Sequence, residues 1–505
     1  MQTLKALADL CETTISADSG SIEISDITLR SSDVSEGYLF AALPGLSVHG
    51  ASFASEAVDK GARAILTDSA GATIIAATGL EVPVLQVADV RSVLGSVSAA
   101  IYGYPTESLP VLGITGTSGK TTTSYFIESA FRTAGHSVGM IGTTGTRING
   151  QPVPTSLTTP EAPDLQRLFA QMRDKDIDRV VMEVSSHALC LGRVNGTHFR
   201  IGAFLNLSQD HLDFHHTMEE YFAAKAQLFR RESTTCCDRA VICIDDDWGR
   251  RMWQIAQTSG LDPVSVSTTG PADYTAGPSS NRPDGTQSCT IETPSGQEME
   301  LFLPMPGRFN VANALVALAM ADLAGLPTED ALAGIANVVV PGRLERVDKG
   351  QDFIAVVDYA HKPAAVAAVI NELRGEIEGR LAVVLGAGGD RDSGKRAIMG
   401  MEAARGADLF IVTDDNPRSE DPALIRAAVE AGAEQVPETE RAEIRNIGDR
   451  AQAIEEAIAW AQPGDAVLVA GKGHETGQNI GGKIHHFDDR EVVEDALLRY
   501  LNGDL

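Results

Sequence analysis

A glycine-rich loop constrains this sequence more than any other feature. The residues GITGTSGKTTT (113–123) follow an apolar, strand-like run and open a helix-like segment. Gly116 and Gly119 allow backbone N–H groups to surround a phosphate. Lys120 adds positive charge, and the Thr121 hydroxyl can bind Mg²⁺. The loop therefore predicts a nucleotide site at the carboxyl end of a parallel strand.

The loop departs from the usual GxxxxGKS/T pattern at one position. Ile114 stands where the first glycine is expected, and Gly113 lies one residue too early. The alternative interpretation is an ordinary glycine-rich turn, although a GKT triplet between a strand and a helix favours a phosphate loop. A motor, a switch, a kinase and a ligase all fit this motif, so other residues must separate them.

The alternation of strand, turn and helix recurs along all 505 residues. At about 150 residues per compact unit, this length predicts three units. Proline-containing breaks near YGYPTESLP and VVVPGRLERV place them at 1–105, 106–340 and 341–505. The alternation indicates an α/β fold with parallel sheets. Residues 270–303 differ, because DG and SG turns between alternating segments predict a small antiparallel insert.

Composition limits the classes of function. The formal net charge of −28 at pH 7 repels nucleic acid phosphates and anionic membrane surfaces. The six cysteines lack metal-binding spacing, so we expect them to be reduced. No run of about 18 apolar residues occurs, and the first residues lack a signal-peptide pattern. We therefore expect a cytoplasmic protein that binds no nucleic acid and does not insert into the membrane.

Two further strand ends carry polar side chains. MEVSSHAL places Glu183 and Ser185 after one apolar run, and LNLSQDHLDFH places Asp210, His211 and Asp213 after another. Carboxylate and imidazole groups at such positions suit a divalent ion or an ordered shell of water. Strand ends that are merely capped are an equally good interpretation of each motif alone.

A lysine shares the apolar stripe of a predicted helix. In TMEEYFAAKAQLF (217–229), Tyr221, Phe222 and Phe229 define a stripe that also holds Lys225. Burial lowers the pKa of a lysine, and the neutral amine can pair with a carboxylate or react with carbon dioxide to form an anionic carbamate. A lysine whose stem packs while its ammonium reaches water is the alternative.

Polar loops follow the strands of the third predicted unit, namely DYAHK, GAGGDRD, DDNPR and GKGHE. Because ligands of open parallel sheets bind at the carboxyl ends of the strands, these loops should meet at one edge. Arg391 and Arg418 would suit a substrate carboxylate there, and Glu475 a substrate ammonium. Solvated surface arginines and a tight turn with a charged exit are the alternatives.

Together these motifs resemble those of the Mur ligases of peptidoglycan synthesis, specifically the members that add the third residue of the peptide. The matching strings are GTSGKTT, MEVSSHAL, the span from DHLDFH to AAKAQLF, GRFNVANALVA, PGRLE, DYAHKP, GAGGDRD, DDNPR and GKGHE. They cover the second and third units almost completely. The first unit resembles the family less closely, because Ser32 stands where the uridine-side segment usually has an arginine.

The resemblance implies three domains and one reaction. The domains are an N-terminal α/β UDP-binding domain, a central P-loop ATPase domain with a parallel sheet and the antiparallel insert, and a C-terminal Rossmann-like domain for an amino acid. With ATP and Mg²⁺, the γ-carboxylate of D-Glu in UDP-MurNAc-L-Ala-D-Glu would become an acyl phosphate. The amine of meso-diaminopimelate would then displace phosphate. We expect a monomer that acts on these small molecules.

The resemblance also carries over site residues. Its catalytic residues map onto Lys120, Lys225, Glu183 and His211. Its metal ligands map onto Thr121, Glu183, His211 and Lys225, the last modified to the carbamate N6-carboxylysine. Its ATP contacts map onto Gly116, Thr117, Ser118, Gly119, Lys120, Thr121, Thr122, Asn310, Arg343, Asp358 and His361. Its UDP-MurNAc-dipeptide contacts map onto Leu29, Ser31, Leu46, Ser47, Val48, Thr158, Thr159, Ser185 and Arg193. Its diaminopimelate contacts map onto Arg391, Asp415, Asn416, Pro417, Arg418, Gly471 and Glu475.

The expected amino acid depends on Arg418. The side chain of diaminopimelate ends in an ammonium and a carboxylate, whereas that of L-lysine ends in an ammonium alone. An arginine that faces the lysine ammonium would be an unpaired, repelling charge. The alternatives are the lysine-adding version of the same ligase and, from another class, a P-loop nucleotide switch. ATP consumption that requires both the UDP precursor and an amino acid would exclude the switch.

Overall fold

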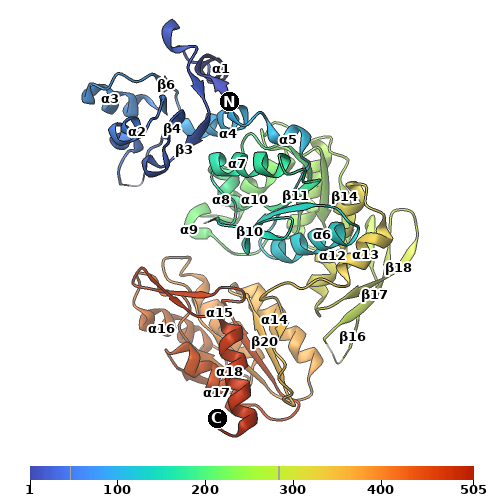
Figure 1. Ribbon diagram of the computed structural model, residues 1–505. Coiled ribbons are helices and arrows are strands. Elements are labelled where there is room, and N and C mark those ends of the chain that lie inside the picture. The colour runs from blue at the N-terminus through green and yellow to red at the C-terminus, as the bar shows by residue number, and fades with distance from the viewer. Residues whose placement is uncertain (46, 156, 283–284) are drawn as a thin grey trace.

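The computed structural model describes residues 1–45, 47–155, 157–282 and 285–505 (Figure 1). Its described strands form three main sheets of four, twelve and six strands, which follow one another along the chain. The N-terminal sheet lies at one end of the molecule in Figure 1, the central sheet in the middle and the C-terminal sheet at the other end. The predicted α/β class is confirmed, while the predicted unit boundaries stay predictions.

The N-terminal sheet is entirely parallel, with helices as crossovers. A short antiparallel pair and one helix precede it, and a turn of helix leads out of it toward the central sheet. In sheet order its strands are β3 (Asp26–Thr28), β4 (Tyr38–Ala42), β5 (Ala64–Thr67) and β6 (Val84–Gln86). The surrounding elements are β1 (Gln2–Thr3), β2 (Glu23–Ile24), α1 (Leu4–Leu10), α2 (Ala54–Asp59), α3 (Ser69–Thr78), α4 (Val90–Ile101) and α5 (Pro105–Ser108).

The central sheet has a parallel middle and antiparallel edges. Its parallel strands, in sheet order, are β8 (Val138–Gly142), β11 (Arg179–Glu183), β7 (Val111–Thr115), β12 (Phe199–Phe204), β13 (Arg239–Cys243), β14 (Val264–Ser267) and β15 (Tyr274–Ala276). The edge strands are β9 (Gly145–Ile148), β10 (Gln151–Val153), β16 (Ser280–Asn281), β17 (Gln287–Glu292) and β18 (Glu298–Leu303). The antiparallel pairing of β17 with β18 confirms the predicted insert. Strand β7, which precedes the phosphate loop, lies between two parallel neighbours.

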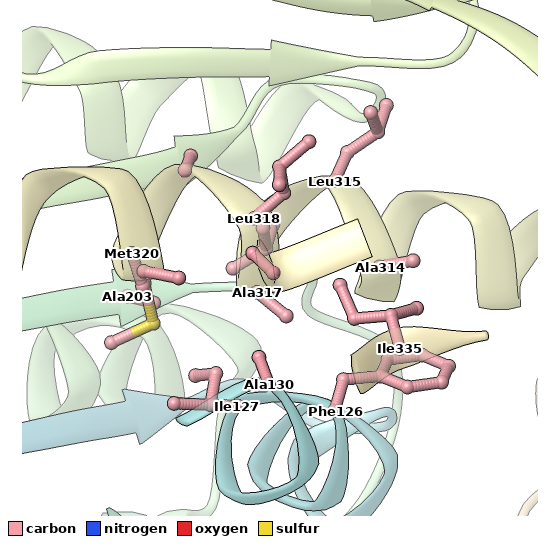
Figure 2. Close-up of a cluster of buried hydrophobic side chains, with 14 of the residues drawn as sticks. Phe126, Ile127, Ala130, Ala203, Ala314, Leu315, Ala317, Leu318, Met320 and Ile335 are labelled. Carbon is pink, nitrogen blue, oxygen red and sulfur yellow. The ribbon is translucent and has the colours of Figure 1, made fainter. Parts of the chain in front are cut away.

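Helices cover both faces of the central sheet. Figure 2 shows side chains of α6 and α12, among them Ala130 and Ala317, meeting in one of the two buried cores. A Cβ atom on Gly334 would lie 2.4 Å from the Ala130 Cα, so glycine lets α13 pack closely against α6. This core holds α6 (Lys120–Thr133), α12 (Arg308–Leu323) and α13 (Thr328–Ile335). The other core holds α7 (Ala162–Arg173), α8 (Ser186–Cys190), α10 (Met218–Ala226) and α11 (Asp247–Thr258).

The C-terminal sheet is Rossmann-like, with helices on both faces. In sheet order its strands are β19 (Glu345–Arg346), β20 (Ile354–Asp358), β24 (Ala466–Ala470), β21 (Leu381–Leu385), β22 (Leu409–Val412) and β23 (Glu443–Asn446). All pairs except β19 with β20 are parallel. The flanking elements are α14 (Pro363–Glu376), α15 (Lys395–Gly406), α16 (Pro422–Ala433), α17 (Arg450–Trp460), α18 (Asp489–Asn502) and the hairpin of β25 (Gly477–Ile480) with β26 (Lys483–His486). Among the described helices, none has both the length and the apolarity to cross a bilayer.

Candidate active site

A cavity of about 950 Å³ is lined by residues of both the central and the C-terminal sheet units. Its wall holds the phosphate loop, the polar ends of β11 and β12, and the loops after β20, β21, β22 and β24. The predicted meeting of the four polar loops at one edge is thereby confirmed. The predicted site residues that line it are Thr117, Ser118, Gly119, Lys120, Thr121, Thr122, Thr158, Glu183, Ser185, His211, Asn310, Arg343, Asp358, His361, Arg391, Asp415, Asn416, Arg418, Gly471 and Glu475.

The phosphate loop forms because a glycine turns the chain from β7 into α6. Gly119 caps α6 with a φ of +87°, in the left-handed region that favours glycine. A Cβ atom there would also lie 2.2 Å from the Asn313 Oδ1 atom, so no other residue fits without movement. The first N–H groups of a helix lack intrahelical partners and carry the positive end of its dipole. This helix start therefore offers an anion site.

The outer side of the loop is held by Asn206, a residue that sequence reasoning missed. The Thr117 N–H donates to the Asn206 carbonyl over 3.0 Å, and the Ser118 N–H donates to the Asn206 side-chain oxygen over 2.9 Å. The Asn206 amide donates back to the Ser118 carbonyl over 3.1 Å. These three hydrogen bonds fix the loop to the segment that follows β12.

Lys120 and Lys225 reach the carbonyl groups of the same loop. The Nζ atoms of both lysines donate to the Gly116 carbonyl over 2.9 Å, and Lys120 also donates to the Thr117 carbonyl over 3.1 Å. Burial, together with the ammonium of Lys362, lowers the pKa of Lys120 to about 8. Two lysine side chains therefore hold the same carbonyl group of the loop.

Lys225 lies behind the cavity wall rather than on it. It is 1% exposed, which excludes the alternative in which its ammonium reaches water. Its Nζ atom lies 4.5 Å from the centre of the Tyr221 ring. Burial and the neighbouring ammonium groups of Lys120 and Lys362 lower the pKa of Lys225 well below its ordinary value. The side chain is therefore suited to a neutral amine, as the apolar stripe predicted.

Glu183 forms a buried oxygen cluster beside the helix start. The Thr121 hydroxyl donates to Glu183 Oε1 over 2.9 Å. Thr143, which sequence reasoning also missed, donates its N–H to Oε1 and its hydroxyl to Oε2, each over 2.9 Å. Because the carboxylate is 1% exposed, these bonds hold it in one orientation. The hydroxyl and carboxylate pair offers the hard oxygen ligands that Mg²⁺ prefers.

His211 lines the cavity but contacts a different carboxylate. Its Nε2 atom lies 3.2 Å from Asp210 Oδ2, and its ring centre lies 4.8 Å from that of His187. Burial lowers the pKa of His211 to about 3, so its imidazole is neutral at pH 7. Burial alone would raise the pKa of Asp210, but the neighbouring Lys362 and His211 hold it well below the ordinary value. The role of His211 as a metal ligand stays a prediction.

Several residues that are predicted to face the nucleotide lie along one wall of the cavity. Asp358 accepts the N–H groups of Leu344 over 2.8 Å and Ala360 over 2.7 Å. Burial raises the pKa of Asp358. The Arg343 guanidinium lies 4.4 Å from the centre of the Tyr359 ring. The Asp358 carboxylate is thus fixed by two backbone groups, while Arg343 stacks on the neighbouring Tyr359 ring.

The amino-acid end of the cavity combines arginines with carboxylates. Arg418 has a φ of +52° and donates one side-chain N–H to the Gly389 carbonyl over 2.5 Å. Because a guanidinium has five N–H donors, it can serve further acceptors. The Asn416 amide donates to Glu475 Oε2 over 2.9 Å. Burial, and then the nearby Asp415, raises the pKa of Glu475.

Lys472, which sequence reasoning missed, holds the two carboxylates of this end together. Its fully buried Nζ atom lies 3.3 Å from Glu475 Oε2 and 3.7 Å from Asp415 Oδ1. It also donates to the Gly477 carbonyl over 2.6 Å. The lysine thus offsets part of the negative charge, so two carboxylates can lie close together at this end.

Some predicted residues lie off the cavity. Thr159 and Arg193 lie close to it, because the Thr159 hydroxyl donates to the Glu183 carbonyl over 2.9 Å and Arg193 donates to the Thr159 carbonyl over 3.5 Å. Leu46 lies outside the described residues. The others that do not line the cavity are Gly116, Lys225 and Pro417, together with Leu29, Ser31, Ser47 and Val48 of the N-terminal unit. The cavity lining therefore gives no support to a uridine site among these last four.

The fold and the site define a phosphate-loop protein in which a pocket of arginines and carboxylates, on a separate Rossmann-like sheet, shares one cavity with the loop. Three family models match successive parts of the chain: "Mur ligase family, catalytic domain" over 23–102, "Mur ligase middle domain" over 114–321 and "Mur ligase, glutamate ligase domain" over 342–473. The chain belongs to the Mur ligase family and is an ATP-dependent ligase. The resemblance stated from the motifs is confirmed.

Individual relatives agree with this assignment. A UDP-N-acetylmuramoyl-L-alanyl-D-glutamate--2,6-diaminopimelate ligase of Corynebacterium glutamicum is 57% identical over 92% of this chain and 90% of the relative. A protein of the same name from Streptomyces coelicolor is 50% identical over 96% of this chain and 94% of the relative. A solved structure of a ligase of that name is 31% identical, with a TM-score of 0.69 over 99% of this chain and 100% of that chain. The MurF ligase of Thermotoga maritima, solved with ADP, shares the fold at 19% identity and a TM-score of 0.63, over 95% of this chain and 97% of that chain.

Proposed function

We propose that this chain joins meso-diaminopimelate to the γ-carboxylate of D-Glu in UDP-MurNAc-L-Ala-D-Glu, at the expense of ATP, in peptidoglycan precursor synthesis. The printed names of the relatives support this reaction. The structural observation that carries it is the shared cavity, in which a phosphate loop and a pocket of arginines and carboxylates face the same space. An acyl phosphate made at one end could then be attacked by an amine held at the other.

The first step in this proposal is phosphoryl transfer. An oxygen of the D-Glu carboxylate attacks the γ-phosphorus, the bond between that phosphorus and the bridging oxygen breaks, and ADP leaves. Because carboxylate and ATP are both anions, the step depends on positioning and on stabilising negative charge. The start of α6 and the Lys120 ammonium would supply that stabilisation.

Mg²⁺ is part of the proposal, and Thr121 and Glu183 would hold it. Within the described ranges, no three His, Cys, Asp or Glu side chains gather closely enough to bind a metal by themselves. The Thr121 hydroxyl and the single Glu183 carboxylate fit Mg²⁺, which is usually held by one or two carboxylates together with substrate phosphates and water. His211 and a carbamate on Lys225 would complete the set. When bound, the ion would neutralise charge on the phosphates.

We include carbamylation of Lys225 in the proposal. The neutral amine would add to carbon dioxide to form a carbamate anion, with release of one proton. Its buried, apolar surroundings favour the neutral amine, and the ammonium groups of Lys120 and Lys362 would stabilise the resulting anion. A lysine that is merely packed into the core would not need such neighbours.

The second step joins the amino acid. A neutral amine of diaminopimelate attacks the carbonyl carbon of the acyl phosphate, the bond from that carbon to the phosphate oxygen breaks, and phosphate and one proton leave. The far end of the amino acid carries a carboxylate and an ammonium. Arg418 would bind the carboxylate and Glu475 the ammonium. L-lysine would leave Arg418 without its partner.

An amino-acid panel tests this function. Purified protein is incubated with UDP-MurNAc-L-Ala-D-Glu, ATP and Mg²⁺, and each amino acid is scored by the mass of the UDP product. We expect meso-diaminopimelate to be joined at a kcat/KM at least 100-fold above that for L-lysine, because the arginine contact is lost with lysine. Equal turnover of the two would contradict the assignment of Arg418, and faster turnover of lysine would favour the lysine-adding ligase.

The proposal extends to the uridine end, the location and the oligomeric state of the protein. Ser31 donates its hydroxyl to Glu56 over 2.7 Å, and Val48 is 50% exposed, so the N-terminal contacts would need to rearrange or add to existing bonds. Action in the cytoplasm fits the use of ATP and the six free cysteines. A monomer is kept as the expected state, for which a solution mass measurement is the test.

A further inference from the structure

Lys362 joins the C-terminal unit to the phosphate loop. It precedes Pro363 at the start of α14, and its backbone is extended, with φ −130° and ψ 146°, as a residue before proline prefers. Its Nζ atom donates to the Thr117 carbonyl over 2.7 Å and lies 3.0 Å from Asp210 Oδ2. The residue is 8% exposed and lines the cavity.

The ammonium groups of Lys120 and Lys362 share one acceptor. Lys120 donates to the Thr117 carbonyl over 3.1 Å and Lys362 donates to it over 2.7 Å, so two like charges meet at a single oxygen. Like charges in a partly desolvated site repel each other. An anion bound between the two ammonium groups would remove that repulsion and accept from both.

Asp210 offsets only part of this charge. It pairs with Lys362 and lies 3.7 Å from the Nζ atom of Lys395, a second lysine of the C-terminal unit. One carboxylate therefore faces two ammonium groups. An ammonium has three N–H donors. The Thr117 carbonyl accepts one of those on Lys362, while Asp210 Oδ2 lies at an ion-pair distance of 3.0 Å. Lys362 thus has both unbalanced charge and a spare donor beside the predicted phosphate site.

We propose that Lys362 is a further phosphate-binding residue, which contacts the γ-phosphate of ATP from the C-terminal side of the cavity. The inference rests on the proposed use of ATP, although not on the identity of the amino acid. Lys362 would leave the Thr117 carbonyl and Asp210 when the nucleotide arrives. Because the group comes from the other sheet, γ-phosphate stabilisation would depend on the approach of the C-terminal unit to the phosphate loop.

Nucleotide binding tests this role without turnover. The Kd values of ADP and of a non-hydrolysable ATP analogue are measured by calorimetry with Mg²⁺ for the full chain and for Lys362→Met. We expect the analogue to bind at least tenfold more weakly to the variant, because a charged contact is lost, while the Kd of ADP changes less than twofold. Lys362→Arg should retain most of the preference for the triphosphate.

Control variants show whether a change in nucleotide affinity comes from the charge of Lys362 or from a general effect on the protein. Lys349→Met removes a lysine from the surface of the same unit, where it pairs with Glu494 at 3.2 Å, and should leave both Kd values unchanged. If Lys362→Met fails to fold, Lys362→Gln keeps a donor and a similar length without the charge. Equal weakening of ADP and analogue, or no weakening of either, in the folded variant would overturn the inference.

Turnover supplies a second readout. In Lys362→Met, kcat should fall by about 10²-fold, because one charged donor to the transferred phosphoryl group is removed. The KM for the amino acid should change less than about threefold. If the wild-type protein joins no amino acid, the proposed function fails while the binding comparison still decides the role of Lys362. An unchanged kcat in an active enzyme would count against a contact to the γ-phosphate.

Discussion

The two ends of the cavity are built differently. At the phosphate end, Thr121, Glu183 and Lys225 are each at most 5% exposed, and each has a fixed hydrogen-bond partner. At the amino-acid end, Arg391 is exposed, and Arg418 and Glu475 are half-buried. These three side chains of the phosphate end are therefore held in place before any ligand arrives, whereas the amino-acid end retains donors and charge for its ligand.

This difference shows where reaction and selectivity are determined. Phosphoryl transfer needs the same charges in the same positions whatever amino acid follows. A rigid, buried site for this step therefore does not limit which amino acid can be joined. Selection among amino acids needs contacts that a wrong ligand leaves unpaired. Changes at the phosphate end should therefore reduce kcat, and changes at the amino-acid end should raise one KM.

The largest effect is expected from Lys225→Ala. Loss of the carbamate should lower kcat by about 10³-fold or more, because a charged group of the transfer site is removed. Short carboxylates such as formate or acetate should restore part of the activity by occupying the space of the carbamate. The measurement is initial ADP release with and without the additive, and circular dichroism checks the fold. Rates like those of the wild type would remove Lys225 from the site.

A smaller and more selective effect is expected from Arg418→Ala. The KM for diaminopimelate should rise by about 10- to 100-fold, because a charged hydrogen bond to its carboxylate is lost. The KM for ATP should stay within about twofold, since Arg418 lies at the other end of the cavity. Full saturation curves for both substrates measure this. Parallel increases in both KM values would show that the two ends do not act separately.

The smallest expected effect is a pH dependence at the amino-acid end. Burial and Asp415 raise the pKa of Glu475, so its carboxylate takes up a proton at a higher pH than an ordinary glutamate. The protonated form cannot bind an ammonium, and the KM for diaminopimelate should therefore increase as the pH falls from 8 toward 5.5. In Glu475→Gln, the KM should be higher at pH 8 and nearly flat. A wild-type KM that is constant over this range would contradict this role.

Local sequence patterns predicted the phosphate end of the cavity well. The turn of GITGTSGKTTT into a helix and the apolar stripe around Lys225 both lie within short segments, so sequence periodicity identifies them. The meeting of the four C-terminal loops also followed from the general placement of ligands on parallel sheets. These features need no knowledge of how the sheets pack against one another.

Long-range contacts could not be read from the same patterns. Asn206 contacts Ser118 across 88 residues, Thr143 contacts Glu183 across 40, and Lys362 contacts Thr117 across 245. Each depends on which strands become neighbours and on how the C-terminal unit faces the central one. A signal for Lys362 was present, because it stands in a polar loop after a strand and directly before a proline.

The most direct test of the account is whether ATP consumption needs both ends of the cavity to be filled. ADP release is measured with ATP and Mg²⁺ alone, with UDP-MurNAc-L-Ala-D-Glu added, with diaminopimelate added, and with both. The account predicts sustained release only when both are present, with one ADP formed per UDP product. Sustained release that neither substrate changes would contradict it and would favour a nucleotide switch.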